Sequence, residues 1–233
     1  HALGASRNGV TVGNLADFTS FSFHAVKNLT TAEGGCATWK HIDGIDDGEL
    51  YHLYQLYSLH GQSKDALAKT KAGAWEYDIV GPWYKCNMTD IMAAIGLVQL
   101  KRYPSLIQRR YEIVKKYDEA MDAMHIEHIQ HVSDMYHSSA HLYMIRIPDI
   151  SVEQRNEIIT RMAENGVATN VHYKPLPMMS GYKAFGWDIK DFPNAYHLYH
   201  NEITLPLHTL LSDEDVEIVI QTLRSTLEEM KLL

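Results

Sequence analysis

The sequence is poor in cysteine, in excess positive charge and in long apolar runs. Its 2 cysteines, Cys36 and Cys86, are too few for a disulfide framework and lack the spacing of a metal site. A reducing, cytoplasmic setting is therefore expected. No apolar run approaches the roughly 20 residues of a membrane span, and no basic-then-apolar signal segment opens the sequence. The net charge of −8 argues against a nucleic-acid partner, which would need a clustered basic face.

What the sequence does contain is the composition of a folded globular protein. Hydrophobic residues make up 45% and charged residues 21% of its 233 residues, which suffices for one large domain or two modest ones. The negative charge does not exclude a phosphorylated ligand. Such sites are built from helix N-termini, backbone amides and one or two cations.

Local patterns predict an α/β protein of two parts. Strands are predicted over 18–23 and 35–39, a helix over 47–60, and a long helix from Thr89 to Met121 that Pro104 should kink or restart. After about residue 125 the pattern becomes α+β. There, strands are predicted over 141–147, 167–173 and 203–207, and helices over 152–165, 192–200 and 212–230. The connection over 61–84, with Lys64, Lys69 and Lys71, is predicted to be irregular, and long loops of this kind are usually functional.

The most informative stretch is 21–35, where an aromatic-rich strand delivers a single lysine, Lys27, into a polar turn. Ser22 lies five residues before the lysine, and the pair Gly34 and Gly35 follows it. A lysine amine in this setting suits covalent capture of an aldehyde cofactor that carries a phosphate. The glycines are expected to allow a close backbone approach or φ > 0. The alternatives are a surface loop lysine and a solvated strand serine.

This stretch resembles the pyridoxal-phosphate signature of the DegT/DnrJ/EryC1/StrS family, the sugar aminotransferases of fold type I. The resemblance implies that Lys27 forms the Schiff base with pyridoxal 5'-phosphate and that Ser22 donates to the cofactor phosphate. It implies an α/β fold in which 1–124 is the remainder of the large mixed-sheet domain, including the bridging helix. Residues 125–233 would form the small α+β domain. The resemblance covers nearly the whole chain but matches only the C-terminal part of a family member.

A second segment, 84–90, precedes the run Ala93-Ala94-Ile95-Gly96. It resembles the family's N-Y-R-M or K-Y-N-M segment, which reaches into the neighbouring subunit's active site, with Cys86 at the aromatic position. A cation and an amide just before a helix N-terminus make a good anion site. In the family such residues meet the cofactor phosphate or the incoming substrate, so the resemblance implies that Lys85 binds substrate and Asn87 binds cofactor. Helix capping and ordinary surface positions are the alternatives.

A third segment, 171–177, resembles the family's H-Y-x-P motif, which borders the sugar-nucleotide pocket. His172 and Tyr173 are expected to bind substrate, although a strand histidine is more often structural. A metal site is not expected. His125, His128 and His131 are spaced three apart, but no acidic or cysteine partner completes a ligand set.

The resemblance implies transamination of a nucleotide-linked keto-deoxy sugar, with glutamate as donor and 2-oxoglutarate as its keto acid, in cell-surface glycan synthesis. The forms SFHAVKN and K-x-N-M favour amination at C4, with C3 left open. Family dehydratases typically carry histidine in place of the lysine, so Lys27 argues against that reaction. A homodimer with shared active sites is expected.

The alternative reading is a non-catalytic fragment, or one half of a split aminotransferase. The family's upstream Asp for the pyridine nitrogen, its phosphate-binding turn and its stacking aromatic are not in the sequence. A large domain cut through its sheet should expose strand edges and apolar surface. Poor solubility or association is therefore expected.

Overall fold

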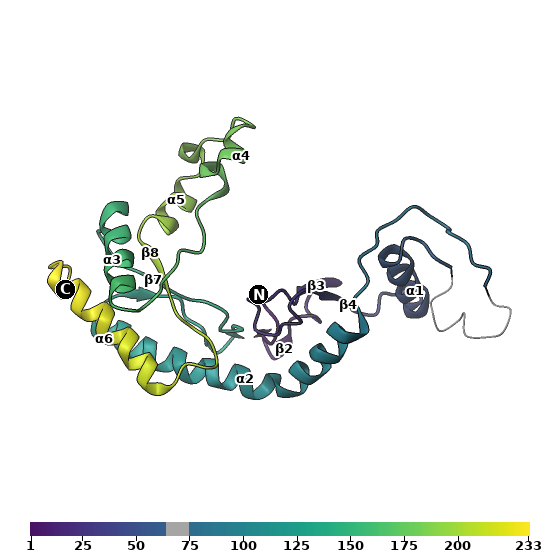
Figure 1. The fold of residues 1–233 in the computed structure, drawn as a ribbon, viewed down its shortest axis with the longest axis horizontal. Coiled ribbons are helices and arrows are strands. Elements are labelled where there is room, and N and C mark those ends of the chain that lie inside the picture. Colours follow the sequence, from purple (N-terminus) through teal and green to yellow (C-terminus); the bar gives the residue numbers. More distant parts are fainter. Residues whose placement is uncertain (64–74) are drawn as a thin grey trace. The chain divides into compact units, whose positions relative to one another are not determined.

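The structure, a computed structural model, describes residues 1–63 and 75–233. The three loop lysines Lys64, Lys69 and Lys71 lie outside the described residues. The chain divides into two compact units, His1–Arg102 and Tyr103–Leu233, and the division falls within helix α2 (Asp90–Ala123) (Figure 1). The domain boundary at 124/125 stays a prediction.

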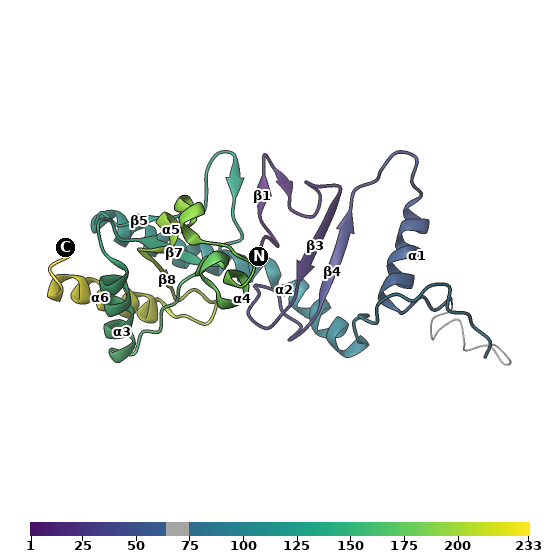
Figure 2. The ribbon, with the colours of Figure 1, turned by 90° about the horizontal axis from the view of Figure 1, so that it is seen from above.

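The first unit is built around an antiparallel hairpin of β3 (Phe18–Ser22) and β4 (Gly35–Trp39), seen side by side in Figure 2. Phe18 pairs with Trp39 at one end and Ser22 with Gly35 at the other, so both predicted strands are confirmed. The unit also contains β1 (Ser6–Arg7), β2 (Val10–Thr11), α1 (Asp47–Ser58) and the first part of α2.

The helices of the first unit begin where short polar side chains cap them. The Asp46 carboxylate accepts from Glu49 N at 2.9 Å before α1, and Thr89 Oγ1 accepts from Met92 N at 3.4 Å before α2. Both predicted starts are confirmed. The 34-residue helix α2 runs through Pro104, so the predicted restart is wrong, and the alternative, a kink at Pro104, stays a prediction. A proline removes one intrahelical hydrogen bond, and this helix has many more on either side.

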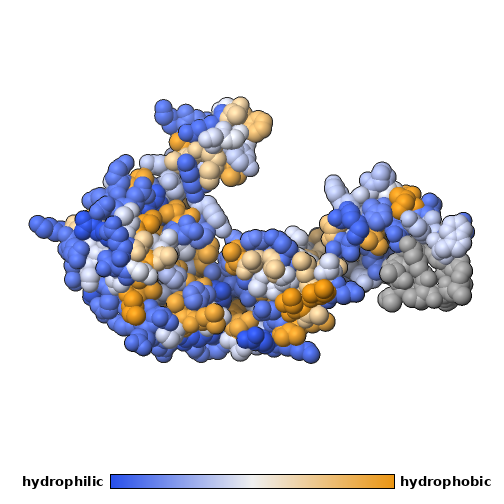
Figure 3. All heavy atoms as spheres, viewed as in Figure 1, coloured by the Kyte–Doolittle hydropathy of each residue, from blue (hydrophilic) through white to orange (hydrophobic). Residues whose placement is uncertain are grey.

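Apolar side chains are exposed on the first turns of α2 in this unit, as Figure 3 shows. Ile91 is 77% exposed and Leu97 63% exposed. A cavity of about 570 Å³ with a mainly apolar lining, including Phe21, Leu29 and Met88, lies in the same unit. The expected exposure of apolar surface is therefore confirmed, and association in solution stays a prediction.

The second unit packs helices on one face of a three-stranded antiparallel sheet of order β5-β7-β8. The strands are β5 (Glu127–His128), β7 (Tyr143–Arg146) and β8 (Glu202–Leu205), with β6 (Tyr136–His137) outside this sheet. The longer helices are α3 (Val152–Glu164) and α6 (Asp213–Glu229), beside the C-terminal part of α2. The short ones are α4 (Ser180–Lys183), α5 (Pro193–Tyr199) and the 3-10 turns Leu176–Met178 and Ile189–Asp191.

Alternation along β7 and β8 separates a core face from a polar face. Tyr143, Ile145, Ile203 and Leu205 are each at most 2% exposed and belong to the core. Since side chains alternate along a strand, the residues between them face the other way. That second face carries Met144 and Arg146 of β7 and their cross-strand partners in β8.

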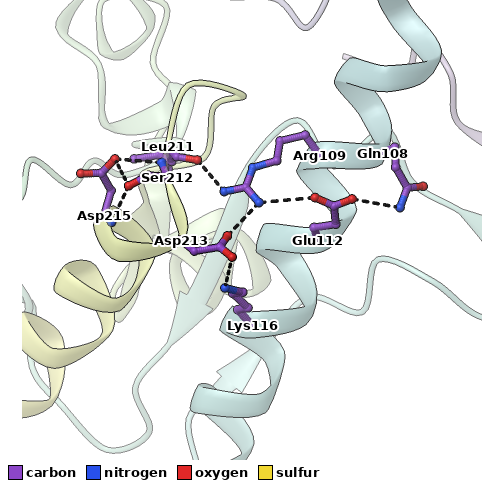
Figure 4. A network of polar contacts seen from close by, with 8 residues as sticks. All are labelled: Gln108, Arg109, Glu112, Lys116, Leu211, Ser212, Asp213 and Asp215. Atoms are coloured by element: carbon purple, nitrogen blue, oxygen red, sulfur yellow. Dashed lines mark hydrogen bonds and ion pairs between the residues drawn. The ribbon is translucent and has the colours of Figure 1, made fainter.

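Two capping boxes define where the helices α3 and α6 begin. Ser151 with Gln154 begins α3, and Ser212 with Asp215 begins α6, so the helices predicted over 152–165 and 212–230 are confirmed. A polar network then joins α2 to the start of α6, with Arg109 and Lys116 both bound to Asp213 (Figure 4).

The strand predicted over 167–173 is wrong. Only one bridge, between Asn170 and Thr204, forms there. Two neighbouring backbone N–H groups donate to side chains instead of to a strand ladder. Val171 N donates to Asn170 Oδ1 at 2.7 Å and His172 N to Glu202 Oε2 at 2.9 Å. The strands predicted over 141–147 and 203–207 are confirmed in shorter form as β7 and β8.

None of the helices within 1–63 and 75–233 combines the length and apolar character that crossing a membrane requires.

Candidate functional site

The loop between β3 and β4 carries Lys27, and backbone hydrogen bonds close its base. Phe23 N donates to Gly34 O at 2.8 Å, and Thr31 N donates to Phe23 O at 2.9 Å. Lys27 N donates to His24 O at 2.9 Å, which closes a turn at the lysine itself. The lysine is therefore held on a hydrogen-bonded loop at the end of a strand.

The glycine pair is required by close packing under this loop. Gly34 has φ +152°, and a Cβ there would lie 2.5 Å from Thr31 Oγ1 and 2.6 Å from Met88 Cε. A Cβ on Gly35 would lie 2.5 Å from Phe21 O. Contacts this short do not occur, so the predicted structural role of both glycines is confirmed.

Lys27 is half-buried, and its amine lies 2.6 Å from Nε2 of His1. Lys27, His1, Ser22 and Asn28 line one small hollow. The imidazole nitrogen accepts a hydrogen bond from the lysine ammonium and orients it. His1 is absent from the set of site residues predicted from the sequence. No local pattern signals this pair, because only the fold brings together residues 26 positions apart.

Ser22 stands at the end of β3, and its hydroxyl oxygen accepts a hydrogen bond from His24 N at 3.3 Å. Within the described residues the hydroxyl proton has no acceptor, so it is available to a ligand. A lysine amine and an available hydroxyl donor, both from residues that line the same hollow, fit an aldehyde ligand that carries a phosphate. The residues present therefore fit the cofactor that the motif implies.

Lys85 and Asn87 lie in the exposed segment just before α2. The Lys85 ammonium donates a hydrogen bond to Asn87 Oδ1, so the two side chains are already neighbours. This contact leaves the Asn87 amino group able to donate and keeps a cation beside it. Both stand close to the N-terminus of a long helix, where anions are favoured. Their roles in binding substrate and cofactor stay predictions.

His172 and Tyr173 belong to the second unit, whereas Lys27 belongs to the first. His172 Nδ1 lies 2.8 Å from Thr204 Oγ1, and its ring meets that of Tyr173 edge-on at 4.6 Å. Burial lowers the pKa of His172, which favours its neutral form. His172 lines a cavity of about 280 Å³ with Arg146 and Glu202. Tyr173 is 61% exposed.

Glu202 and Thr204 are buried polar residues beside this cavity that the sequence analysis missed. Glu202 is 4% and Thr204 5% exposed, and burial raises the pKa of the Glu202 carboxyl. The order Glu-Ile-Thr-Leu along β8 is the signal that could have found them. Polar residues at every second position of a fully buried strand need partners on that face.

The histidine-rich segment has acidic neighbours that the sequence did not reveal. His128 Nδ1 lies 3.1 Å from Asp118 Oδ1, and His128 Nε2 lies 3.1 Å from Asp122 Oδ1. Both carboxylates belong to α2. The carboxylates bind opposite ring nitrogens, so they cannot share a metal ion with the ring. Over residues 1–63 and 75–233, no group of three or more His, Cys, Asp or Glu side chains could hold a metal.

Comparison with known proteins places this geometry in a family. A family model described as DegT/DnrJ/EryC1/StrS aminotransferase matches residues 1–224. Among solved structures, a putative sugar aminotransferase, Spr1654 from Streptococcus pneumoniae, in its PMP-form is 57% identical with a TM-score of 0.93. The match covers 100% of this chain and 58% of that one. The PLP-form of the same protein matches with a TM-score of 0.91 at 54% identity.

Curated relatives agree with this match. Spore coat polysaccharide biosynthesis protein SpsC of Bacillus subtilis is 37% identical over 96% of this chain and 57% of its own length. A UDP-4-amino-4,6-dideoxy-N-acetyl-beta-L-altrosamine transaminase of Campylobacter jejuni is 32% identical over 99% of this chain and 58% of its own length. The chain thus spans somewhat more than half the length of these relatives.

Proposed function

Because the chain belongs to the DegT/DnrJ/EryC1/StrS aminotransferase family, we propose that it serves pyridoxal-phosphate-dependent transamination of a nucleotide-linked keto-deoxy sugar. Glutamate is the proposed amino donor, with 2-oxoglutarate as its product, and C4 is the favoured position. The names of the relatives support a role in glycan synthesis, since one is a transaminase of a UDP-linked amino sugar and another a spore coat polysaccharide biosynthesis protein.

The observation that carries the proposal is the placement of Lys27. Its amine stands on a loop closed by hydrogen bonds, 2.6 Å from an imidazole nitrogen and in the same hollow as the Ser22 hydroxyl. When bound, pyridoxal phosphate supplies the electron sink for cleavage of the C–H bond, which no side chain provides. Lys27 Nζ is the group proposed to hold the cofactor and to move the proton between carbon atoms. The His1 ring keeps that amine oriented.

The other predicted residues fall into two roles. Ser22 is proposed to donate to the cofactor phosphate, and Asn87 to donate to the cofactor from the segment before α2. Lys85, His172 and Tyr173 are proposed to contact the nucleotide sugar. Because Lys85 and Asn87 are exposed, their side chains are free to contact the site of a neighbouring copy. We propose a homodimer on this ground. A cytoplasmic setting is part of the same proposal.

A second candidate follows from the coverage of the relatives. Since the chain spans 58% of the Spr1654 chain, the second candidate we propose is a part that binds without performing chemistry by itself. Under this reading, Lys27 would need residues from outside the chain to act.

The visible absorption spectrum with added pyridoxal phosphate tests the proposal. We expect a band that depends on Lys27, is lost in Lys27→Ala and bleaches on addition of glutamate. Lys40→Ala is the matched control, because Lys40 follows the same hairpin and only approaches Asp17 at 3.9 Å. A band that persists in Lys27→Ala would refute the role of Lys27. A Lys27-dependent band that glutamate leaves unchanged would favour the second candidate.

A further inference from the structure

A chain of hydrogen bonds in the second unit joins a buried carboxylate to His172. Thr204 Oγ1 donates to Glu202 Oε1 at 2.5 Å, and the same oxygen lies 2.8 Å from His172 Nδ1. The other carboxylate oxygen, Oε2, accepts from His172 N at 2.9 Å. Glu202 and Thr204 are almost fully buried on the polar face of β8.

With Glu202 as the carboxylate, the state in which both of its oxygens accept, the proton count along this chain determines the state of the histidine ring. A threonine hydroxyl has one proton, and here it is donated to Glu202. Thr204 Oγ1 must then accept from His172, which requires the proton of the neutral ring on Nδ1. Nε2 is left with a lone pair, and among the described residues it has no hydrogen-bond partner. His172 also lines the cavity of about 280 Å³.

We propose that Glu202 and Thr204 are positioning residues that hold His172 in its Nδ1–H tautomer. Nε2 then accepts a hydrogen bond from a hydroxyl or amide N–H group of the ligand that enters this cavity. That the ligand is a nucleotide sugar rests on the proposed function, whereas the tautomer rests on the hydrogen bonds alone. Histidine recognises a donor of this kind only when the correct nitrogen is unprotonated.

Substitution of Glu202 by Gln gives a sharp prediction. His172 N can only donate, so the amide oxygen of the new side chain must face it, and the amide nitrogen must face Thr204. Thr204 then accepts from that nitrogen and turns its own proton to His172 Nδ1. Glu202→Gln should therefore invert the major tautomer and place the proton on Nε2.

The test is a long-range ¹H–¹⁵N correlation spectrum of the full chain with labelled histidine, recorded above the range where the ring titrates. His172→Gln identifies the His172 signals. We expect an unprotonated Nε2 in the unmodified chain and a protonated Nε2 in Glu202→Gln. Glu127→Gln is the matched control, because Glu127 lines the same cavity and pairs with Arg146 at 3.4 Å without touching this chain of bonds. It should leave the tautomer unchanged.

Thr204→Val provides a second variant should Glu202→Gln fail to fold. Removal of the hydroxyl takes away the acceptor at Nδ1, so the single tautomer should give way to a mixture. A protonated Nε2 in the unmodified chain would overturn the proposal, as would an unchanged tautomer in both variants.

Titration of the same sample with UDP-N-acetylglucosamine separates this proposal from the proposed function. A shift of the His172 Nε2 resonance, absent in Glu202→Gln, supports the assigned ligand class. No shift, with the tautomer as expected, overturns the ligand class and leaves the positioning role standing. Neither result depends on the Lys27 band, which reports on the first unit.

Discussion

Asp213 at the start of α6 binds Arg109 of α2, with 2.8 Å between Asp213 Oδ1 and Arg109 Nη1 (Figure 4). Its second oxygen lies 2.8 Å from Lys116 Nζ, and Arg109 also donates to Leu211 O at 2.6 Å. Hydrogen bonds from Lys116 and Arg109 hold the pKa of Asp213 below its ordinary value. The network thus joins two helices of the second unit through one carboxylate.

This network makes a pH-dependent contribution to stability. A carboxyl with a lowered folded-state pKa stabilises the fold above its unfolded pKa, and the effect is lost as pH falls through the folded value. Asp213→Asn should therefore lower the free energy of unfolding at neutral pH and flatten its decline in acid. Urea unfolding across the acidic range measures both. Glu214→Gln, in the same first turn, is the control and should keep the acid dependence, and equal curves for the two variants would contradict the prediction.

Local chemistry explains why much of the fold could be predicted from the sequence. Asp46, Ser151 and Ser212 each cap a helix that the sequence pattern predicts to begin at the next residue. These starts can be predicted because capping involves only residues within one turn of the helix. The 167–173 segment shows the limit of this reasoning. Its apolar pattern suits a strand, but buried Glu202, some thirty residues away, takes the His172 N–H. A contact of that span leaves no local signal.

The candidate site likewise contains residues that could be predicted from the sequence and contacts that could not. Lys27 and Ser22 share one hairpin, so a local stretch that resembles the family signature was enough to predict both. His1 contacts Lys27 only through the fold, and the hydrogen-bond chain from Glu202 to His172 joins two segments distant in sequence. Long-range polar contacts of this kind become visible only in the folded structure.

Gly34→Ala should destabilise the first unit. The new methyl would clash with Thr31 and Met88 beneath the loop, in addition to its unfavourable φ. We expect a loss of about 1–3 kcal/mol in the free energy of unfolding, measured by denaturant titration. Gly9→Ala is the control, because Gly9 also has positive φ (+78°) but meets nothing within 4 Å. Equal losses would show that backbone strain, and not crowding, is the cause.

Arg155 should be essential to the stability of the second unit, whereas Arg161 on the same helix should not. It is 2% exposed and donates to the backbone carbonyls of Tyr199 at 3.1 Å and Glu202 at 3.2 Å. Arg155→Met leaves one buried and one partly buried carbonyl without this donor, and we expect a loss of about 2–4 kcal/mol. Arg161→Met, also in α3, removes a solvent-exposed pair with Glu157 and should change the unfolding midpoint little. Similar losses in the two variants would contradict the buried role.

Ser22→Ala should weaken cofactor binding without unfolding the hairpin. A hydrogen bond to a charged group is worth about 1.5–3 kcal/mol, so loss of the donor should raise the Kd for pyridoxal phosphate about tenfold or more. Titration of the Lys27-dependent absorption band measures the change. Ser20→Ala is the matched control, because Ser20 lies two residues earlier on the same face of β3 and pairs with Ala37. If Ser22 binds the phosphate, the Kd rises in Ser22→Ala and not in Ser20→Ala. If Ser22 is only a solvated strand residue, both variants keep the Kd of the unmodified chain.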